Sequence, residues 1–387
     1  MEKVGKVIVK LRIPILIISF LLLIPAGLGY VYTRVNYDIL YYLPGDIETM
    51  KGQDILLDEF GKGAYATVVV QGMDSKDEAK LEDKIKNVDH VTDIVSYNSF
   101  VGNTVPTELI PEKYRSIFEN QESGCTMFVI FFDDTTSSDE TMNAIGELRE
   151  LARGQCFISG MSAVVTDTKK ITQQETLAYV VIACVLTSIV LAVFMDSFLV
   201  PVFFMLSIGM AIVYNLGSNI FMGEVSFLTK ALAAVLQLGV TMDYSIFLWH
   251  SYKEKKEENG DDHNKAMAQA IGSTITSVVG SSITTVAGFL ALCFMSFTLG
   301  LDLGIVMAKG VVIGVIGCVT ILPSLILTFD RALEKTTHRE IMPARFDRLA
   351  DFVVNHSWIF IIVFLVLLGP AIYGYNNTNV YYNLTDT

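Results

Sequence analysis

Seven apolar runs, each long enough to cross a bilayer, constrain the fold of this chain more than any other feature. The hydrocarbon core of a membrane is about 30 Å thick, and a helix of about 20 apolar residues crosses it. Hydrophobic residues make up 52% of the 387 residues, and the mean hydropathy is +0.48. We therefore expect a polytopic α-helical membrane protein with spans at 13–32, 177–195, 198–220, 231–252, 275–299, 303–329 and 358–373.

The first run does not have the features of a cleaved signal peptide. It holds about 20 apolar residues, a tyrosine and an arginine follow it, and no small-residue cleavage pattern is present. We therefore expect it to remain as the first span.

Basic residues in the short loops predict how the chain is oriented in the cell membrane. The loops around Gly223 and Leu301 hold no basic residue, whereas three other segments are basic. The positive-inside rule then places the N-terminus in the cytoplasm and the long segment 33–175 outside. A net charge of −13 argues against nucleic acid as a partner. The basic segments are the N-terminus (Lys3, Lys6, Lys10, Arg12), the loop after the fourth run (Lys253, Lys255, Lys256, Lys265) and the segment after the sixth (Arg331, Lys335, Arg339, Arg345, Arg348).

The segment between the first two spans has the pattern of an α+β domain. Apolar and β-branched runs predict strands at 64–72, 90–100, 125–134 and 155–160. Amphipathic stretches predict helices at 75–88 and 137–153, with a helical insertion at 106–120. Ser75 and Glu78 would form a capping box, and Ser137 or Ser138 would cap the later helix. The order β-α-β-β-α-β is that of a ferredoxin-like domain.

These patterns divide the chain into six parts. They are the cytoplasmic N-terminus with span 1 (1–32), the extracytoplasmic domain (33–175), spans 2 to 6 (176–329), a basic amphipathic linker (330–356), span 7 (357–375) and the start of a second extracytoplasmic segment (376–387).

One carboxylate lies deep inside an apolar run, in "LQLGVTMDYSIFLWH" (236–250). Asp243 is about 12 residues from one end of its run and about 9 from the other, beyond a side chain's reach of water. A charge there costs about 2.5–3.5 kcal/mol. Gln237, Thr241 and Tyr244 share an adjoining helix face. Asp243 is either a neutral acid bonded to a neighbouring helix or a carboxyl that gains and loses a proton, as intramembrane acids of pumps do.

Other polar residues in the runs allow two interpretations each. Ser277, Ser281 and Thr284 share one helix face, which would either pack closely on a neighbour or form a hydroxyl-lined wall beside Asp243. Asp302 and Lys309 lie near the outer end of the sixth run. Lys309 would either extend towards the interface or pair with Asp302 near the transport path. Gly310 and Gly314 form a GxxxG pattern that predicts a packing face.

The sequence offers no sign of a cofactor or an enzymatic site. No Cys/His spacing indicates a metal site, and no GxxxxGK[ST] motif indicates direct use of ATP. Cys125 and Cys156 would lie on non-adjacent strands, which favours free thiols over a disulfide. An intramembrane aspartyl protease would need two deep carboxyls, and only Asp243 is deep.

The stretch "GVTMDYSIFL" resembles the fourth-span motif of the MMPL-type branch of the resistance-nodulation-division (RND) transporters. "YDILYYLPGD" (37–46), "SSITTVAGFLALCFM" (281–295) and the order of parts are similar as well, over essentially the whole chain. The resemblance implies a proton-motive-force-driven exporter of lipids or other hydrophobic molecules, with a porter-type outer domain. It also implies that Asp243 carries the proton and Tyr244 relays it, together with an equivalent pair from a second half. Sterol-sensing-like and secretion-motor-like proteins of the same superfamily remain the alternatives.

The two ends of the chain align with each other at an offset of 345 positions. This pattern is typical of a two-fold repeat. It predicts a natural protein of about 690 residues with twelve spans and two outer domains, or a complementary half on a second polypeptide, and it is compatible with an oligomer. The aligned residues are Pro25-Ala26 with Pro370-Ala371, Gly29-Tyr30 with Gly374-Tyr375, Tyr37 with Tyr382, and Val4 and Ile8 with Leu349 and Val353.

Overall fold

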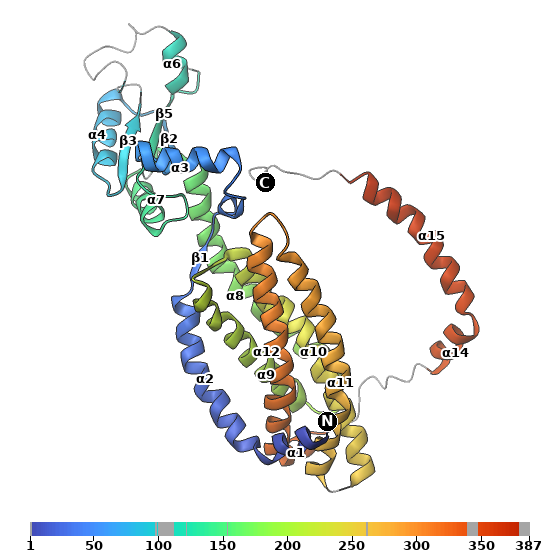
Figure 1. The fold of residues 1–387 in the computed structure, drawn as a ribbon. Coiled ribbons are helices and arrows are strands. Elements are labelled where there is room, and N and C mark those ends of the chain that lie inside the picture. Colours follow the sequence, from blue (N-terminus) through green and yellow to red (C-terminus); the bar gives the residue numbers. More distant parts are fainter. Residues whose placement is uncertain are drawn as a thin grey trace.

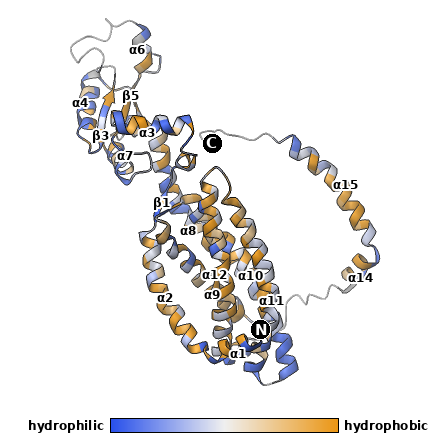
Figure 2. Cartoon of the chain, in the orientation of Figure 1, coloured by the Kyte–Doolittle hydropathy of each residue, from blue (hydrophilic) through white to orange (hydrophobic). Residues whose placement is uncertain are grey.

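The computed structural model describes residues 2–96, 99, 112–120, 122–152, 154–260, 262–338 and 347–378. An α+β domain stands at one end of a helical bundle, and two further helices, α14 and α15, lie apart from both (Figure 1). The spans are mostly hydrophobic, and hydrophilic residues gather in the α+β domain and at the opposite end of the bundle (Figure 2).

Seven helices of the described chain are long and apolar enough to cross a membrane, as the apolar runs predict. One of them, α12, forms the centre of the bundle, whereas α15 has no buried residue. The seven are α2 (Arg12–Tyr32), α8 (Met161–Phe194), α9 (Leu199–Gly217), α10 (Phe227–Asn259), α11 (His263–Leu292), α12 (Leu299–Thr328) and α15 (Ser357–Asn376).

The helix bounds differ from the expected spans, and α8, α10 and α11 are clearly longer than the apolar runs. The helix α8 begins at Met161, inside the segment assigned to the outer domain, so one helix of about 50 Å joins the domain to the membrane. The span expected at 275–299 ends too late, because α11 ends at Leu292 and α12 starts at Leu299, and its helix begins earlier, at His263. Hydropathy reports only the part of a helix that lies in lipid. Polar turns that continue the helix into water are not apolar, so the hydropathy pattern does not reveal them.

A short parallel pairing fixes the end of the bundle that faces the α+β domain. Strand β1 (Arg34–Asn36) follows α2 and pairs with β7 (Glu224–Ser226), which leads into α10. The 3₁₀ helices η1 (Leu40–Tyr42) and η3 (Ser218–Met222) lie beside these strands in the chain. Side chains of the two paired strands also interact, since Arg34 Nε lies 3.9 Å from Glu224 Oε2. The ends of α2 and α10 are therefore held together outside the apolar layer.

The sheet of the α+β domain has the predicted ferredoxin-like order. Its strands run β3-β5-β2-β6, every pairing is antiparallel, and β4 adds to β5. Helix α3 was not expected, and of the insertion predicted at 106–120 the residues before 112 lie outside the described ones. The elements are α3 (Glu48–Phe60), β2 (Ala64–Gln71), α4 (Ser75–Lys86), β3 (Val91–Val95), α6 (Glu112–Phe118), β4 (Glu119–Asn120), β5 (Cys125–Phe132), α7 (Asp139–Leu151) and β6 (Cys156–Ser159).

One of the two predicted helix caps is formed. Ser138 caps α7, and its side chain accepts a hydrogen bond from the backbone N–H of Thr141 at 3.0 Å. The capping box predicted for α4 is wrong, because Asp74 is the cap residue and Glu78 instead accepts a hydrogen bond from Thr126 Oγ1 on β5 at 2.6 Å. Burial raises the pKa of Glu78. The side chain of Glu78 therefore ties α4 to the sheet. Cys125 and Cys156 are free thiols.

The helices at the two chain ends repeat at the offset seen in the sequence. Helix α1 (Glu2–Lys10) corresponds residue for residue to α14 (Asp347–Asn355), and α2 and α15 begin at corresponding residues. Helix α1 packs against α11, with Ile8 buried. Figure 1 shows α14 and α15 away from the bundle. The repeated unit is thus a short amphipathic helix followed by a span.

Candidate functional site

Helix α10 carries Asp243 on its outer side and Tyr244 on its inner side. Asp243 is exposed, whereas Tyr244 is only 4% exposed and belongs to the core of the bundle. Asp243 lies 16 residues after Phe227, which is about 24 Å along the helix axis. The carboxyl group is therefore at the midpoint of α10, 16 residues from each end, and faces away from the helices that surround Tyr244.

Gln237 and Thr241 lie on the buried side of α10 with Tyr244, as their spacing predicts. Asn215 Nδ2 of α9 donates a hydrogen bond to Gln237 Oε1 at 2.9 Å, and Thr241 Oγ1 donates to the Gln237 carbonyl at 2.6 Å. The second polar atom of each amide, Asn215 Oδ1 and Gln237 Nε2, is buried without a hydrogen-bond partner in the described chain. Sequence reasoning missed Asn215, which is a single amide in the apolar third run.

The GxxxG pair of α12 lies against these polar groups. A Cβ atom on Gly310 would be 2.5 Å from Asn215 Nδ2 and 3.1 Å from Gln237 Oε1, and one on Gly314 would be 2.6 Å from Thr241 Oγ1. The predicted packing face is confirmed. Its function is to let α12 approach a polar strip on α9 and α10.

Asp302 and Lys309 do not form the ion pair that the sequence suggested. Asp302 accepts hydrogen bonds from the Ser226 backbone N–H at 2.7 Å and from Thr229 Oγ1 at 2.8 Å, while Lys309 Nζ donates to Asn219 Oδ1. The two residues are about 10 Å apart along α12, which leaves each side chain with a nearer neutral partner. Asp302 satisfies one backbone donor and one hydroxyl at the start of α10, where a negative charge is also favoured by the helix dipole.

The predicted hydroxyl face of α11 points out of the bundle. Ser277, Ser281 and Thr284 are exposed, and Thr284 Oγ1 donates to the Ser281 carbonyl of its own helix at 2.7 Å. The buried hydroxyls of this helix are Thr274 and Ser282. Close packing within this bundle therefore does not explain the three exposed hydroxyls, which face away from the bundle core as Asp243 does.

A cavity of about 270 Å³ opens where α2, α8, α9 and α10 meet near the α+β domain. Lys230 is the one charged residue in its lining, and its Nζ lies 4.4 Å from the centroid of the Tyr30 ring. Gln173 Nε2 donates to the Tyr37 hydroxyl at 3.4 Å. Leu177 and Val180 continue the same wall of α8 about one and two turns beyond Gln173. The cavity is thus polar at the end nearer the α+β domain and apolar further along α8.

Three potential metal ligands meet at the far end of the bundle, although their sequence spacing gave no sign of a site. His263, Asp330 and Glu334 bring one ligand atom each within 4.8 Å of one another. Lys256 Nζ already pairs with Glu334 Oε1 at 2.9 Å, and the Tyr252 hydroxyl donates to Asp330 Oδ1 at 3.3 Å. These contacts connect the α10–α11 turn to α13 (Asp330–Lys335) as an ion-pair network.

The sequence matches the MMPL family over residues 42–359, which include the α+β domain, spans 2 to 6 and the Asp243 motif. The chain belongs to the MMPL family. It is therefore a membrane transporter of the RND superfamily, a class whose members are typically not enzymes.

Curated relatives are distant in sequence. A putative membrane protein of Methanocaldococcus jannaschii is 24% identical over 82% of this chain and 91% of its own length. A putative membrane protein of Streptomyces coelicolor is 24% identical over 87% of this chain and 42% of its own length. The apo-petrobactin exporter of Bacillus anthracis is 24% identical over 71% of this chain and 37% of its own length. The chain thus spans most of one relative and less than half of the other two.

Proposed function

We propose that this MMPL protein is a proton-motive-force-driven exporter of lipids or other hydrophobic and amphiphilic compounds. The observation that carries the proposal is the exposed carboxyl of Asp243 at the midpoint of the membrane-spanning helix α10. An acid at that depth is a default sign of an ion or proton pathway in a transporter. Asp243 would carry the proton, and Tyr244, buried directly beside it in the chain, would relay it.

The exposure of Asp243 also supports a partner for this face of the bundle. A carboxylate facing lipid at the membrane centre costs about 2.5–3.5 kcal/mol, and in bundles such groups face the interior or a water-filled cavity. A second bundle, from a second copy or from a further half of a longer protein, would enclose Asp243. Ser277, Ser281 and Thr284 would line the same enclosed space, because they also face outwards.

The cavity beside Lys230 supports an amphiphilic cargo. Its polar outer end and its apolar wall at Leu177 and Val180 match a molecule with a polar head and an apolar tail. At about 270 Å³ it is close to the lower end of ligand pockets, so it would hold part of such a molecule. One relative is named an exporter of apo-petrobactin, which agrees with export as the direction of transport.

Reconstitution tests the proposed function directly. The protein is placed in vesicles with a pH gradient of either sign, and the movement of a fluorescent amphiphile is measured together with proton flux. We expect amphiphile movement only with the gradient, and its loss with an uncoupler. Lipid binding without gradient-dependent movement would favour a sterol-sensing-like protein, and cross-linking to a preprotein translocase would favour a secretion-motor-like one.

The orientation is a separate prediction. We expect the α+β domain to be outside and the α10–α11 turn to be cytoplasmic, because the basic residues cluster at the latter end. Single cysteines at the exposed positions Glu140 and Glu257, in a background without native cysteines, would be treated with an impermeant thiol reagent in intact cells. Labelling should occur at position 140 and not at 257. The reverse pattern would invert the topology.

A further inference from the structure

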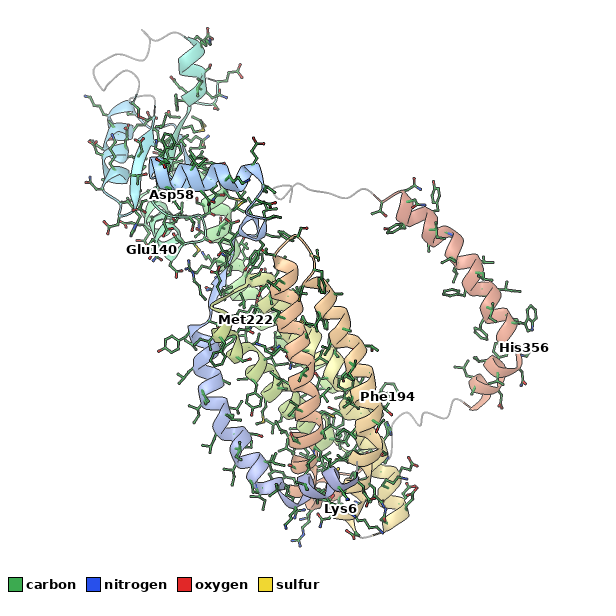
Figure 3. The ribbon with its side chains drawn as sticks, viewed as in Figure 1. Lys6, Asp58, Glu140, Phe194, Met222 and His356 are labelled. Carbon is green, nitrogen blue, oxygen red and sulfur yellow. The ribbon has the colours of Figure 1, made fainter. Side chains whose placement is uncertain are left out.

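A basic cavity lies at the end of the bundle opposite the α+β domain. It has a volume of about 690 Å³ and is formed by α1, the first turn of α2 and the first turns of α11. Figure 3 labels Lys6 at this end, far from Asp58 and Glu140 of the α+β domain. Four cations and two carboxylates line it, which leaves two net positive charges: Lys6, Lys10, Arg12 and Lys265 against Glu2 and Asp262.

Both carboxylates of the cavity are already engaged. Glu2 pairs with Lys6 at 3.0 Å, and Asp262 caps α11 by accepting a hydrogen bond from the Lys265 backbone N–H at 3.0 Å. The neighbouring ammonium group of Lys6, with a smaller effect from Lys265, lowers the pKa of Glu2. Lys10, Arg12 and Lys265 form no salt bridge with a carboxylate in the part of the chain that the structure describes, and Lys265 acts on Glu2 only at longer range. This end of the cavity therefore offers cations to an external anion.

The walls of the cavity are held in place. A Cβ atom on Gly5 would lie 2.2 Å from the carbonyl oxygen of Ala268, so the backbone of α1 rests directly on α11. Arg12 Nη1 donates a hydrogen bond to Asn264 Oδ1 at 2.7 Å, which joins the start of α2 to α11. The cations are thus presented by a preorganised corner of three helices.

Comparison of the two copies of the internal repeat distinguishes the cations from the residues that the helices need to fold. Leu349 and Val353 of α14 keep the apolar side that Val4 and Ile8 give to α1. The cations are not kept, because Asp351, Asn355 and Ser357 stand where Lys6, Lys10 and Arg12 stand in the first copy. An amphipathic helix joined to a span therefore forms in both places, while the cationic set is present only beside α11.

The residues around the cations are typical of a protein segment that lies at a membrane surface. Val9, Ile13 and Pro14 form apolar parts of the cavity wall, and Val4, Val7 and Leu11 are exposed on and after α1. A helix of this kind lies in the interface with its apolar side in the acyl region. Basic pockets at the ends of membrane helices suit lipid phosphate groups.

We propose that the cavity bounded by Lys10, Arg12 and Lys265 binds the anionic phosphate headgroup of a bilayer lipid, whose acyl chains lie along Ile13 and Pro14. The lipid is in the leaflet facing away from the α+β domain, which is the cytoplasmic leaflet in the proposed topology. Binding at this site does not depend on export, so it stands or falls separately from the proposed function.

The test is lipid binding by the purified full chain. The delipidated protein is titrated with phosphatidylglycerol or phosphatidylcholine of identical acyl chains, and bound lipid is counted by native mass spectrometry. We expect a saturable site for phosphatidylglycerol that K10Q/R12Q weakens about 30-fold, at roughly 5-fold per removed charge. K335Q is the matched control, because Lys335 is an exposed lysine at the same end of the bundle outside the cavity. The K335Q variant should bind phosphatidylglycerol as tightly as the wild type does.

A charge-retaining variant separates charge from folding. K10R/R12K should bind phosphatidylglycerol within about 3-fold of the wild type, since both charges remain. Equal binding of the two lipids, or unchanged binding in K10Q/R12Q, would overturn the proposal. Competition by millimolar inorganic phosphate as effective as that by phosphatidylglycerol would also overturn it, because the site would then serve a soluble anion.

Discussion

Replacing Asp243 with asparagine is expected to leave the protein folded in the membrane and to abolish proton-driven transport. Asparagine has nearly the same shape and cannot carry a proton. Because Asp243 faces out of the bundle, the change leaves the packing around Tyr244 intact. Each proton that crosses 100 mV supplies about 2.3 kcal/mol, and without a titratable group this energy is not coupled to transport. We expect gradient-dependent transport to fall by at least about 100-fold, the lower end of what loss of a proton-transfer group costs.

The measurement is amphiphile flux and proton flux in vesicles containing equal amounts of each variant. Y244F should reduce transport less than D243N, because only a hydroxyl is removed. S245A, at a buried hydroxyl that donates to the Thr241 carbonyl of its own helix and lies against Cys318 of α12, is the matched control and should transport normally. Transport by D243N at the wild-type rate would refute the role of Asp243 as proton carrier.

The parts of the fold that follow from local periodicity were predictable. The seven spans and the strand order β3-β5-β2-β6 were expected, because apolar runs and alternation report directly on burial. Helix ends were less predictable. The first turns of α11 are polar, and neither hydropathy nor length distinguishes such turns from a loop.

The common face of three candidate residues was predictable from the sequence, whereas the direction in which each face of α10 points was not. The spacing of Gln237, Thr241 and Tyr244 fixed their common face, and the structure buries all three. Which side of α10 faces outwards depends on the neighbours α9 and α12, and periodicity cannot supply that. For the same reason the sequence left open whether Lys309 pairs with Asp302 or extends to the interface. Tertiary packing gives the two residues Ser226, Thr229 and Asn219 as partners.

The contact between Asn215 and Gln237 is difficult to predict from a single sequence. Each amide is one polar residue in an otherwise apolar run, and such residues are common at helix interfaces in membranes. Their proximity becomes evident only when α12 presents a glycine to both. The GxxxG pattern predicted that α12 approaches its neighbours closely, but not that polar residues lie at the contact.

Replacing Gly310 with leucine is expected to destabilise the bundle severely. The first added carbon would already lie 2.5 Å from Asn215 Nδ2 and 3.1 Å from Gln237 Oε1, and three more carbons would follow. Overpacking of this kind costs about 1–3 kcal/mol. Separating the two amides leaves another buried donor and acceptor without partners, at about 1–3 kcal/mol more. We expect the free energy of unfolding in detergent to fall by about 2–6 kcal/mol, or folding to fail.

A glycine in open surroundings provides the control for this prediction. Gly288 of α11 is exposed, and a Cβ atom there would meet nothing within 4 Å. G288L should therefore change the free energy of unfolding by no more than about 0.5 kcal/mol, as is usual for exposed positions. Both variants would be compared by thermal or denaturant unfolding of the purified protein, with G310A as an intermediate step. Equal stability of G310L and G288L would show that α12 does not approach α9 and α10 as closely as the contact at Gly310 requires.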